Sequence, residues 1–216
     1  EIKECDWSSD VCSSDLAPNA ATLGSMVTQA ESGKTIFQIA ASLATSTDFN
    51  TVYPAFLTKD EFVAKMVGDL LPAGTAAGAV TYATNWVTAQ LNSKVAVSDI
   101  FAAAVSALRT TTNADFLSAK TQLNNKVSVA SYYAVDKLGS STSLTTLQNV
   151  ISGVTNDTAT VTTAKASTDT VANAAAAQTF TLTAGPDSGP AYTGGAANRS
   201  EEHTSELQSH SFISYA

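Results

Sequence analysis

Apolar side chains recur at helical spacing along most of the chain, and this period constrains the fold more than any other feature. The clearest instance follows Thr58 and Glu61, which have the spacing of a capping box, in which two side chains satisfy free backbone N–H groups reciprocally. One helical stripe of apolar residues comes next, and Pro72 and Gly74 end it. The stripe comprises Phe62, Val63, Met66, Val67, Leu70 and Leu71. Such stripes must be buried against one another, so we expect a mainly α fold, a multi-helix bundle.

The same reasoning predicts a succession of helices joined by short breaks. Thr47 or Asp48 is the expected N-cap of a short helical turn that Pro54 ends, because proline disfavours helix at the residue before it. Ser98 or Asp99 is the expected cap of a later helix, and Gly139 is the expected stop of the longest one. The predicted helices span about residues 20–31, 34–44, 47–53, 58–71, 76–91, 98–108, 113–138, 144–154 and 157–177.

The character of the chain changes after Gln178. Residues 179–183 alternate with period two and are rich in β-formers, and glycine and proline crowd residues 185–195. We therefore expect a helical domain over residues 17–177, followed over residues 178–198 by the truncated start of a β-rich, glycine-rich region.

The two ends of the chain are encoded by one DNA segment read in opposite directions. A DNA string that begins AGATCGGAAGAGCACACGTC, and resembles a sequencing-library adapter with its barcode, encodes residues 199–216. Its reverse complement, entered at GAG, encodes residues 1–16. We expect both segments to be translated adapter, and such segments are excluded before fold or function is inferred. The remaining residues, 17–198, are then an internal piece of a longer protein.

This exclusion removes Cys5, Cys12, His203 and His210, which are all the cysteines and histidines of the chain. The usual thiol or hydroxyl nucleophile with an imidazole base is then missing, although a hydroxyl–lysine or a carboxylate pair stays formally open. We expect no enzyme activity, and no catalytic, cofactor-binding or metal-binding residue in this fragment.

The charge left in residues 17–198 is small, −2 against −8 for the whole chain. A chain so nearly neutral has no electrostatic reason to bind nucleic acid or an anionic membrane. No apolar run approaches the roughly 18 residues of a bilayer-spanning helix, so we expect no transmembrane segment.

Three short motifs have a functional and a structural interpretation. Residues 33–35, Gly-Lys-Thr, resemble the end of a phosphate-binding loop, but Thr28 stands where that motif needs glycine, so a glycine break between helices is favoured. Tyr82 and Trp86 could stack on a sugar if exposed, whereas an amphipathic helix more often buries such residues. Tyr132 and its neighbour Tyr133 point about 100° apart, so we expect one in the core and the other at its rim.

Other polar groups are scattered or weakly specific. Nothing in the sequence places Asp60, Glu61 and Asp136 across one cleft, and residues 156–158 match a glycosylation sequon of a kind that often arises by chance. Residues 194–198 are close to the start of a Gly-Gly-x-Gly-x-Asp repeat, which winds a calcium-binding β-roll. We expect calcium binding only in the repeats that would follow.

Several segments occur in the order typical of a helical domain of unknown function in large bacterial surface proteins. The Phe62-Val63 start and the helix end that runs from Trp86-Val87 to Gln-Leu-Asn resemble this domain, although Leu70-Leu71-Pro72 stands where related copies often carry Leu-Gly-Arg. The last matching segment resembles the entry into the calcium-binding region of S-layer-like and RTX-type proteins. The matching segments are residues 46–53, 61–63, 85–93, 125–135, 154–165 and 178–187.

The resemblance implies an extracellular protein of the cell surface, exported by a type I system into a calcium-rich setting. The function expected from it is a non-catalytic helical module with a structural, anchoring or interaction role. Its partners would be a cell-surface polysaccharide or other copies of the chain. The alternatives are the helical leader of a secreted RTX-type enzyme or toxin, with its active site in missing sequence, and an intracellular helical adaptor, which the glycine-rich β entry disfavours.

Overall fold

The computed structural model describes residues 16–176 of the chain. Within this range the secondary structure consists of nine α-helices and two short helices of other types, without a strand, which confirms the expected mainly α class. The expected β-rich start at residues 178–198, both cysteines and both histidines lie outside the described residues. None of the described helices is long and apolar enough to cross a membrane.

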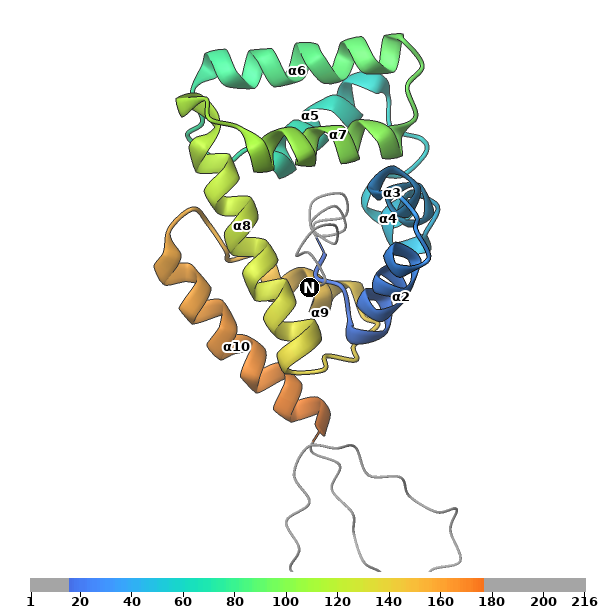
Figure 1. Cartoon of the computed structure of the whole chain (residues 1–216). Helices are drawn as coiled ribbons and strands as arrows, with labels where there is room; N and C mark the ends of the chain where they lie inside the picture. Colours follow the sequence, from blue (N-terminus) through green and yellow to red (C-terminus); the bar gives the residue numbers. More distant parts are fainter. Residues whose placement is uncertain (1–15, 177–216) are drawn as a thin grey trace, which may run out of the picture. The chain divides into compact units, whose positions relative to one another are not determined.

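The helices follow one another with short connections (Figure 1). In chain order they are α2 Ala20–Glu31, α3 Ile36–Ala44, α4 Thr47–Val52, α5 Lys59–Leu70, α6 Ala77–Asn92, α7 Val97–Thr110, the 3₁₀ turn η1 Ala114–Phe116, α8 Leu117–Ser131, the π-helical turn η2 Tyr132–Asp136, α9 Leu144–Ile151 and α10 Thr158–Ala176. Helices α5, α6 and α7 lie together, α3 packs on α7, and α8 leads from the end of α7 towards α9.

The N-caps show where local sequence decides a helix start. The predicted capping box of Thr58 and Glu61 is confirmed. The cap predicted for α4 is wrong, because Ser46, one residue before Thr47, accepts the hydrogen bond from the Phe49 amide. The cap predicted for α7 is also wrong: α7 starts after Ala96 without a side-chain cap, and Ser98 is buried inside the first turn.

The long helix predicted over residues 113–138 is divided into η1, α8 and η2. It starts as a 3₁₀ turn, because the Asn113 side chain accepts a hydrogen bond from the Asp115 amide. Its last turn is π-helical and places Tyr133 in the core, 1% exposed, while Tyr132 stays partly exposed. This division of the two tyrosines is as predicted.

Three apolar clusters hold the described helices together. The largest joins α4, α5, α6, α7 and α8. In it the Phe101 ring contacts the rings of Phe49, Tyr53 and Phe62 edge-on, and the Tyr53 ring also contacts those of Phe49 and Phe62. A second joins α8, η2 and α9, and a third joins α2, α3 and η2.

Leu16, the last residue of the expected adapter segment, is buried in the second cluster. The amide of the next residue, Ala17, donates a hydrogen bond to the Leu147 carbonyl at 3.2 Å. An apolar side chain at this position packs whatever its origin, and the boundary after residue 16 stays a prediction.

Candidate functional site

A cleft of about 420 Å³ opens where α5 ends, α6 begins and α7 ends, and we call it the aromatic cleft. A volume of this size lies within the range of small-ligand sites. Aliphatic and small side chains make its floor, and aromatic and polar side chains stand at its rim. The floor is lined by Val67, Leu70, Leu71, Ala79, Ala83, Val87, Ala104 and Leu108, and the rim by Gly78, Tyr82, Trp86, Ala107, Thr111, Asn113, Asp115 and Phe116.

The aromatic rim is contributed by α6 and η1. Tyr82 and Trp86 are one helical turn apart, so both face the cleft. Tyr82 is 65% exposed, and its ring meets the Phe116 ring edge-on with 6.0 Å between centroids. The expectation that Tyr82 belongs to the core is therefore wrong, whereas Trp86 is half-buried against the large cluster. The reason lies in α6, whose side facing the core presents the smaller residues Ala79 and Val87 instead.

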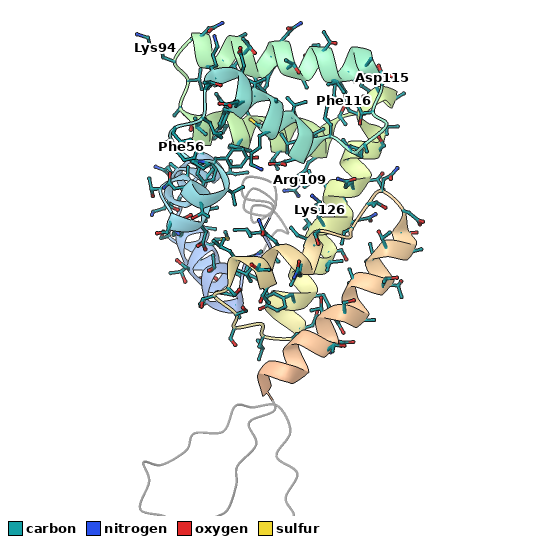
Figure 2. All side chains as sticks on the ribbon, turned by 180° about the vertical axis from the view of Figure 1, so that it is seen from behind. Phe56, Lys94, Arg109, Asp115, Phe116 and Lys126 are labelled. Atoms are coloured by element: carbon teal, nitrogen blue, oxygen red, sulfur yellow. The ribbon has the colours of Figure 1, made fainter. Side chains whose placement is uncertain are left out.

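Apart from the Tyr82 hydroxyl and the Trp86 indole, the polar side chains of the lining lie at the connection between α7 and α8. The Thr111 hydroxyl accepts a hydrogen bond from the Asn113 amide at 3.2 Å, and the Asn113 side chain accepts one from the Asp115 amide at 3.0 Å. Lys120 donates to the Thr111 carbonyl at 3.0 Å, just outside the lining. These bonds hold Asp115 at the rim beside Phe116 (Figure 2) and leave its carboxylate as the one charged group in the lining.

The chemistry of this lining suits binding. Nucleophilic catalysis by a hydroxyl uses a base within hydrogen-bond reach of the nucleophile. The cleft offers one carboxylate, two other polar side chains besides the Tyr82 hydroxyl and the Trp86 indole, and a large apolar floor. It can therefore desolvate an apolar group and orient it by one charge.

A first cluster of ionisable groups away from the cleft contains Tyr53, Lys65 and Asp69. The Tyr53 hydroxyl donates to the Asp69 carboxylate, Lys65 pairs with the same carboxylate at 3.0 Å, and its ammonium lies 4.9 Å from the centre of the Tyr53 ring. All three groups are thereby engaged with one another between the end of α4 and α5, which is the arrangement of a structural contact.

A second cluster, which we call the α10 clasp, consists of Tyr132, Lys137, Lys165 and Asp169. Asp169 on α10 accepts from the Tyr132 hydroxyl at 2.8 Å and pairs with Lys137 at 2.7 Å. Lys137 and Lys165 lie 5.0 and 5.1 Å from the Tyr132 ring centre. Hydrogen bonds with Lys137 and then Tyr132 lower the pKa of Asp169, and the bond with Asp169 raises the pKa of Lys137. Sequence reasoning missed this cluster, because its parts are far apart in the chain.

Two of the remaining candidates from the sequence, residues 33–35 and Glu61, have structural roles. Gly33, with a φ of 86°, links α2 to α3, and Thr35 caps α3. The Lys34 ammonium donates to the Gln29 side chain at 3.0 Å, so residues 33–35 form the favoured helix break. Bonds from the Thr58 hydroxyl and amide lower the pKa of Glu61 and use its carboxylate for capping.

The other candidates of the sequence are not brought to the cleft. Asp60 lies on α5 away from the cleft lining, and Asp136 is on η2. No group of three metal-ligating side chains occurs within the described range, and residues 194–198 lie outside that range. Residues 156–158, the sequon, lie where α10 begins, and Asn156 is exposed.

Compared with protein-family models, with curated proteins and with solved structures, the chain gives no match.

Proposed function

We propose that the chain is a non-catalytic helical module of an exported bacterial surface protein of the S-layer-like or RTX type, and that it anchors or positions that protein through the aromatic cleft. The observation that carries the proposal is the cleft itself, which joins an apolar floor, an aromatic rim with the exposed ring of Tyr82, and a single charge. The order of segments that resemble the surface-protein domain supplies the setting.

The exposed helix faces support a surface role. Charged residues make up only 14% of the chain, and hydroxyls supply much of its polarity. Many of these hydroxyls bond back to the carbonyl one helical turn earlier, as those of Thr81, Thr121 and Thr163 do. Faces of this kind carry little charge to repel a neighbour, so they tolerate close apposition to a neutral polysaccharide or to another protein.

Binding to immobilised partners tests the proposal. The full chain, kept reduced, is passed over two surfaces, one carrying purified bacterial surface polysaccharide and the other carrying the chain itself. We expect retention on at least one surface, and we expect Ala107→Phe, which places a ring at an exposed position of the cleft lining and blocks the cleft, to abolish it. Ala89→Phe, at an exposed position of α6 outside the cleft, is the matched control and is expected to bind as wild type.

The result that would sink the proposal is the absence of retention on both surfaces, or retention that Ala107→Phe leaves unchanged. An adapter-free reading frame of the gene supplies a second test. Continuation after Asn198 into Asp and further Gly-Gly repeats supports the surface-protein assignment, whereas a stop codon or a coiled coil there contradicts it. Catalytic motifs downstream would favour the secreted enzyme or toxin instead.

A further inference from the structure

Phe56 is the most exposed of the large apolar side chains in the described part of the molecule, at 84%. It stands on the connection between α4 and α5, where the Leu57 amide donates to the Pro54 carbonyl at 3.1 Å and closes a turn. The turn directs a whole aromatic ring into solvent. Isolated exposed apolar residues are common, so the exposure of Phe56 by itself does not indicate an interaction site. Its position relative to the cleft is the second observation.

Phe56 and the aromatic cleft lie at opposite ends of the α5–α7 group. Phe56 precedes the start of α5, and the bond between Lys59 and Asn92, at 2.9 Å, ties that start to the end of α6. The cleft lies at the other end, where α5 ends and α6 begins. Figure 2 shows Phe56 and Lys94 on one side of this group and Asp115 and Phe116 on the other. One copy therefore cannot fill its own cleft with Phe56.

The charges near these two sites are complementary. Lys94 is exposed on the turn after α6, with a φ of 58°, and the cleft rim carries the Asp115 carboxylate. Two acids follow Phe56 in the chain: Glu61 accepts hydrogen bonds from Thr58, and Asp60 lines a separate groove between α5 and α6. Asp99 lies in the first turn of α7, where its negative charge interacts favourably with the positive end of the helix dipole.

We propose that the aromatic cleft of one copy receives Phe56 of a second copy, with Lys94 of the incoming copy facing Asp115. This inference rests on the proposed function, and names another copy of the chain as the occupant of that site. Because the two surfaces differ and lie at opposite ends, the contact is heterologous and repeats from copy to copy into an open chain unless the rotation closes a ring.

The contact is small, so it is weak between molecules free in solution. One ring and its surroundings bury far less than the roughly 1,200 Å² that stable complexes reach. Copies held side by side on a surface have a high effective concentration, at which a weak contact is occupied.

Sedimentation velocity of the full chain over a concentration series, under reducing conditions so that Cys5 and Cys12 do not cross-link, tests this assembly. We expect species beyond dimer at high concentration for the wild type. Phe56→Ser removes the inserted ring and Ala107→Phe blocks the cleft, so each variant alone should lose association at least about tenfold. Mixed in equal amounts, they should form a dimer and nothing larger, because one has only a working cleft and the other only a working ring.

Charge reversal gives an independent readout. Lys94→Asp and Asp115→Lys should each weaken association, and together in one chain they should restore it. Phe37→Ser, at an aromatic residue on α3 that is 45% exposed, should associate as wild type. Circular dichroism and thermal melting establish that each variant is folded.

Unchanged association of Phe56→Ser, or no dimer in the mixture, would overturn the inference. Its failure is distinguishable from that of the proposed function. Cleft-dependent retention on polysaccharide without self-association would support the proposed function and contradict the assembly. A chain that stays monomeric and binds neither surface would contradict both.

Discussion

Position 139 has room only for the hydrogen atom that glycine carries as its side chain. Leu138, not the glycine, takes the left-handed conformation after η2, with a φ of 51°. The Gly139 amide donates to the Tyr133 carbonyl at 2.9 Å, so its backbone lies over the buried ring. A Cβ at position 139 would overlap the Tyr133 ring atoms, and Tyr133 cannot withdraw because its hydroxyl accepts from the Ser141 amide.

We therefore expect Gly139→Ala to lower the free energy of unfolding by about 1–3 kcal/mol through overpacking. Urea denaturation followed by circular dichroism measures the change. Gly68→Ala, on an exposed face of α5 where an added Cβ meets nothing, is the matched control and should gain up to about 1 kcal/mol from helix propensity. Equal effects of the two substitutions would contradict the proposed overlap.

Thr58 acts at the same scale, through one hydroxyl. Its hydroxyl accepts from the Glu61 amide, and its hydroxyl and amide both donate to the Glu61 carboxylate at the start of α5. Thr58→Ala should cost about 0.5–2 kcal/mol of unfolding free energy in the same urea experiment. Thr81→Ala, which removes a hydroxyl bonded one turn back inside α6, should be neutral or slightly stabilising. A neutral Thr58→Ala would show that the capping box contributes nothing.

Helix α10 is attached to the other described helices by few contacts. Val161 and Ala164 pack on the second cluster, Thr168 is buried, and the α10 clasp joins Asp169 to Tyr132 and Lys137. The helix is rich in threonine and alanine and has no strong apolar stripe. Its attachment therefore depends on polar groups that titrate and that salt screens.

Asp169→Asn should increase hydrogen exchange in residues 158–176 and leave α5 and α7 unchanged. Asp136→Asn, at an exposed carboxylate on η2 outside the clasp, is the control. High salt should act in the same direction as Asp169→Asn on the wild type. Exchange in α10 that neither the substitution nor salt affects would exclude the clasp as its attachment.

The clasp also predicts a pH window for α10. The pKa of Asp169 is lowered in the folded chain, so its contribution is present above the unfolded value near pH 4 and is lost as the pH falls through the folded value. The pKa of Lys137 is raised, so its contribution is present below about pH 10 and is lost as the pH rises through the folded value. The protection factor of α10, measured by exchange, should be greatest between these limits in the wild type and should depend less on pH in Asp169→Asn.

At the scale of the whole molecule, one aromatic group connects elements that are distant in sequence. Phe101 of α7 contacts Phe49 edge-on with 5.7 Å between ring centres and Tyr53 at 5.1 Å, so it joins α7 to α4 and to the connection that follows it. It also meets Phe62 of α5 at 6.1 Å. This ring is therefore one of the contacts that hold the α5–α7 group to the rest of the described molecule, beside the packing of α3 and α8 on α7.

Phe101→Ala should lower the free energy of unfolding by about 3–5 kcal/mol, because it leaves a cavity where four rings meet. Phe56→Ala removes a ring of equal size from solvent and should stay within about 0.5 kcal/mol of wild type. Chemical denaturation of both variants measures the contrast. A large loss for Phe56→Ala would mean that this residue stabilises the monomer, and it would then be unsuited to the assembly test.

Helix positions were predictable from the chain because they depend on neighbours in sequence. The box of Thr58 and Glu61, and the breaks at Gly33 and Pro72, are local signals, and the helices begin or end at or within a few residues of them. The cap of α4 was assigned wrongly, since Ser46, Thr47 and Asp48 are adjacent and only one of them can cap the helix. The cap of α7 was assigned wrongly because that helix starts after Ala96 without a side-chain cap.

The cleft and the clasp were not predictable in the same way. Whether Tyr82 faces the core or solvent depends on how α5 and α7 pack beside α6, and the α10 clasp joins residues 37 positions apart. Periodicity states that a helix has an apolar face, but not which neighbour covers it or how far the cover extends. The amino-acid sequence alone determined the helices because their hydrogen bonds are local. Tertiary packing alone decided which aromatic rings stay uncovered, because burial depends on residues that meet only in the folded chain.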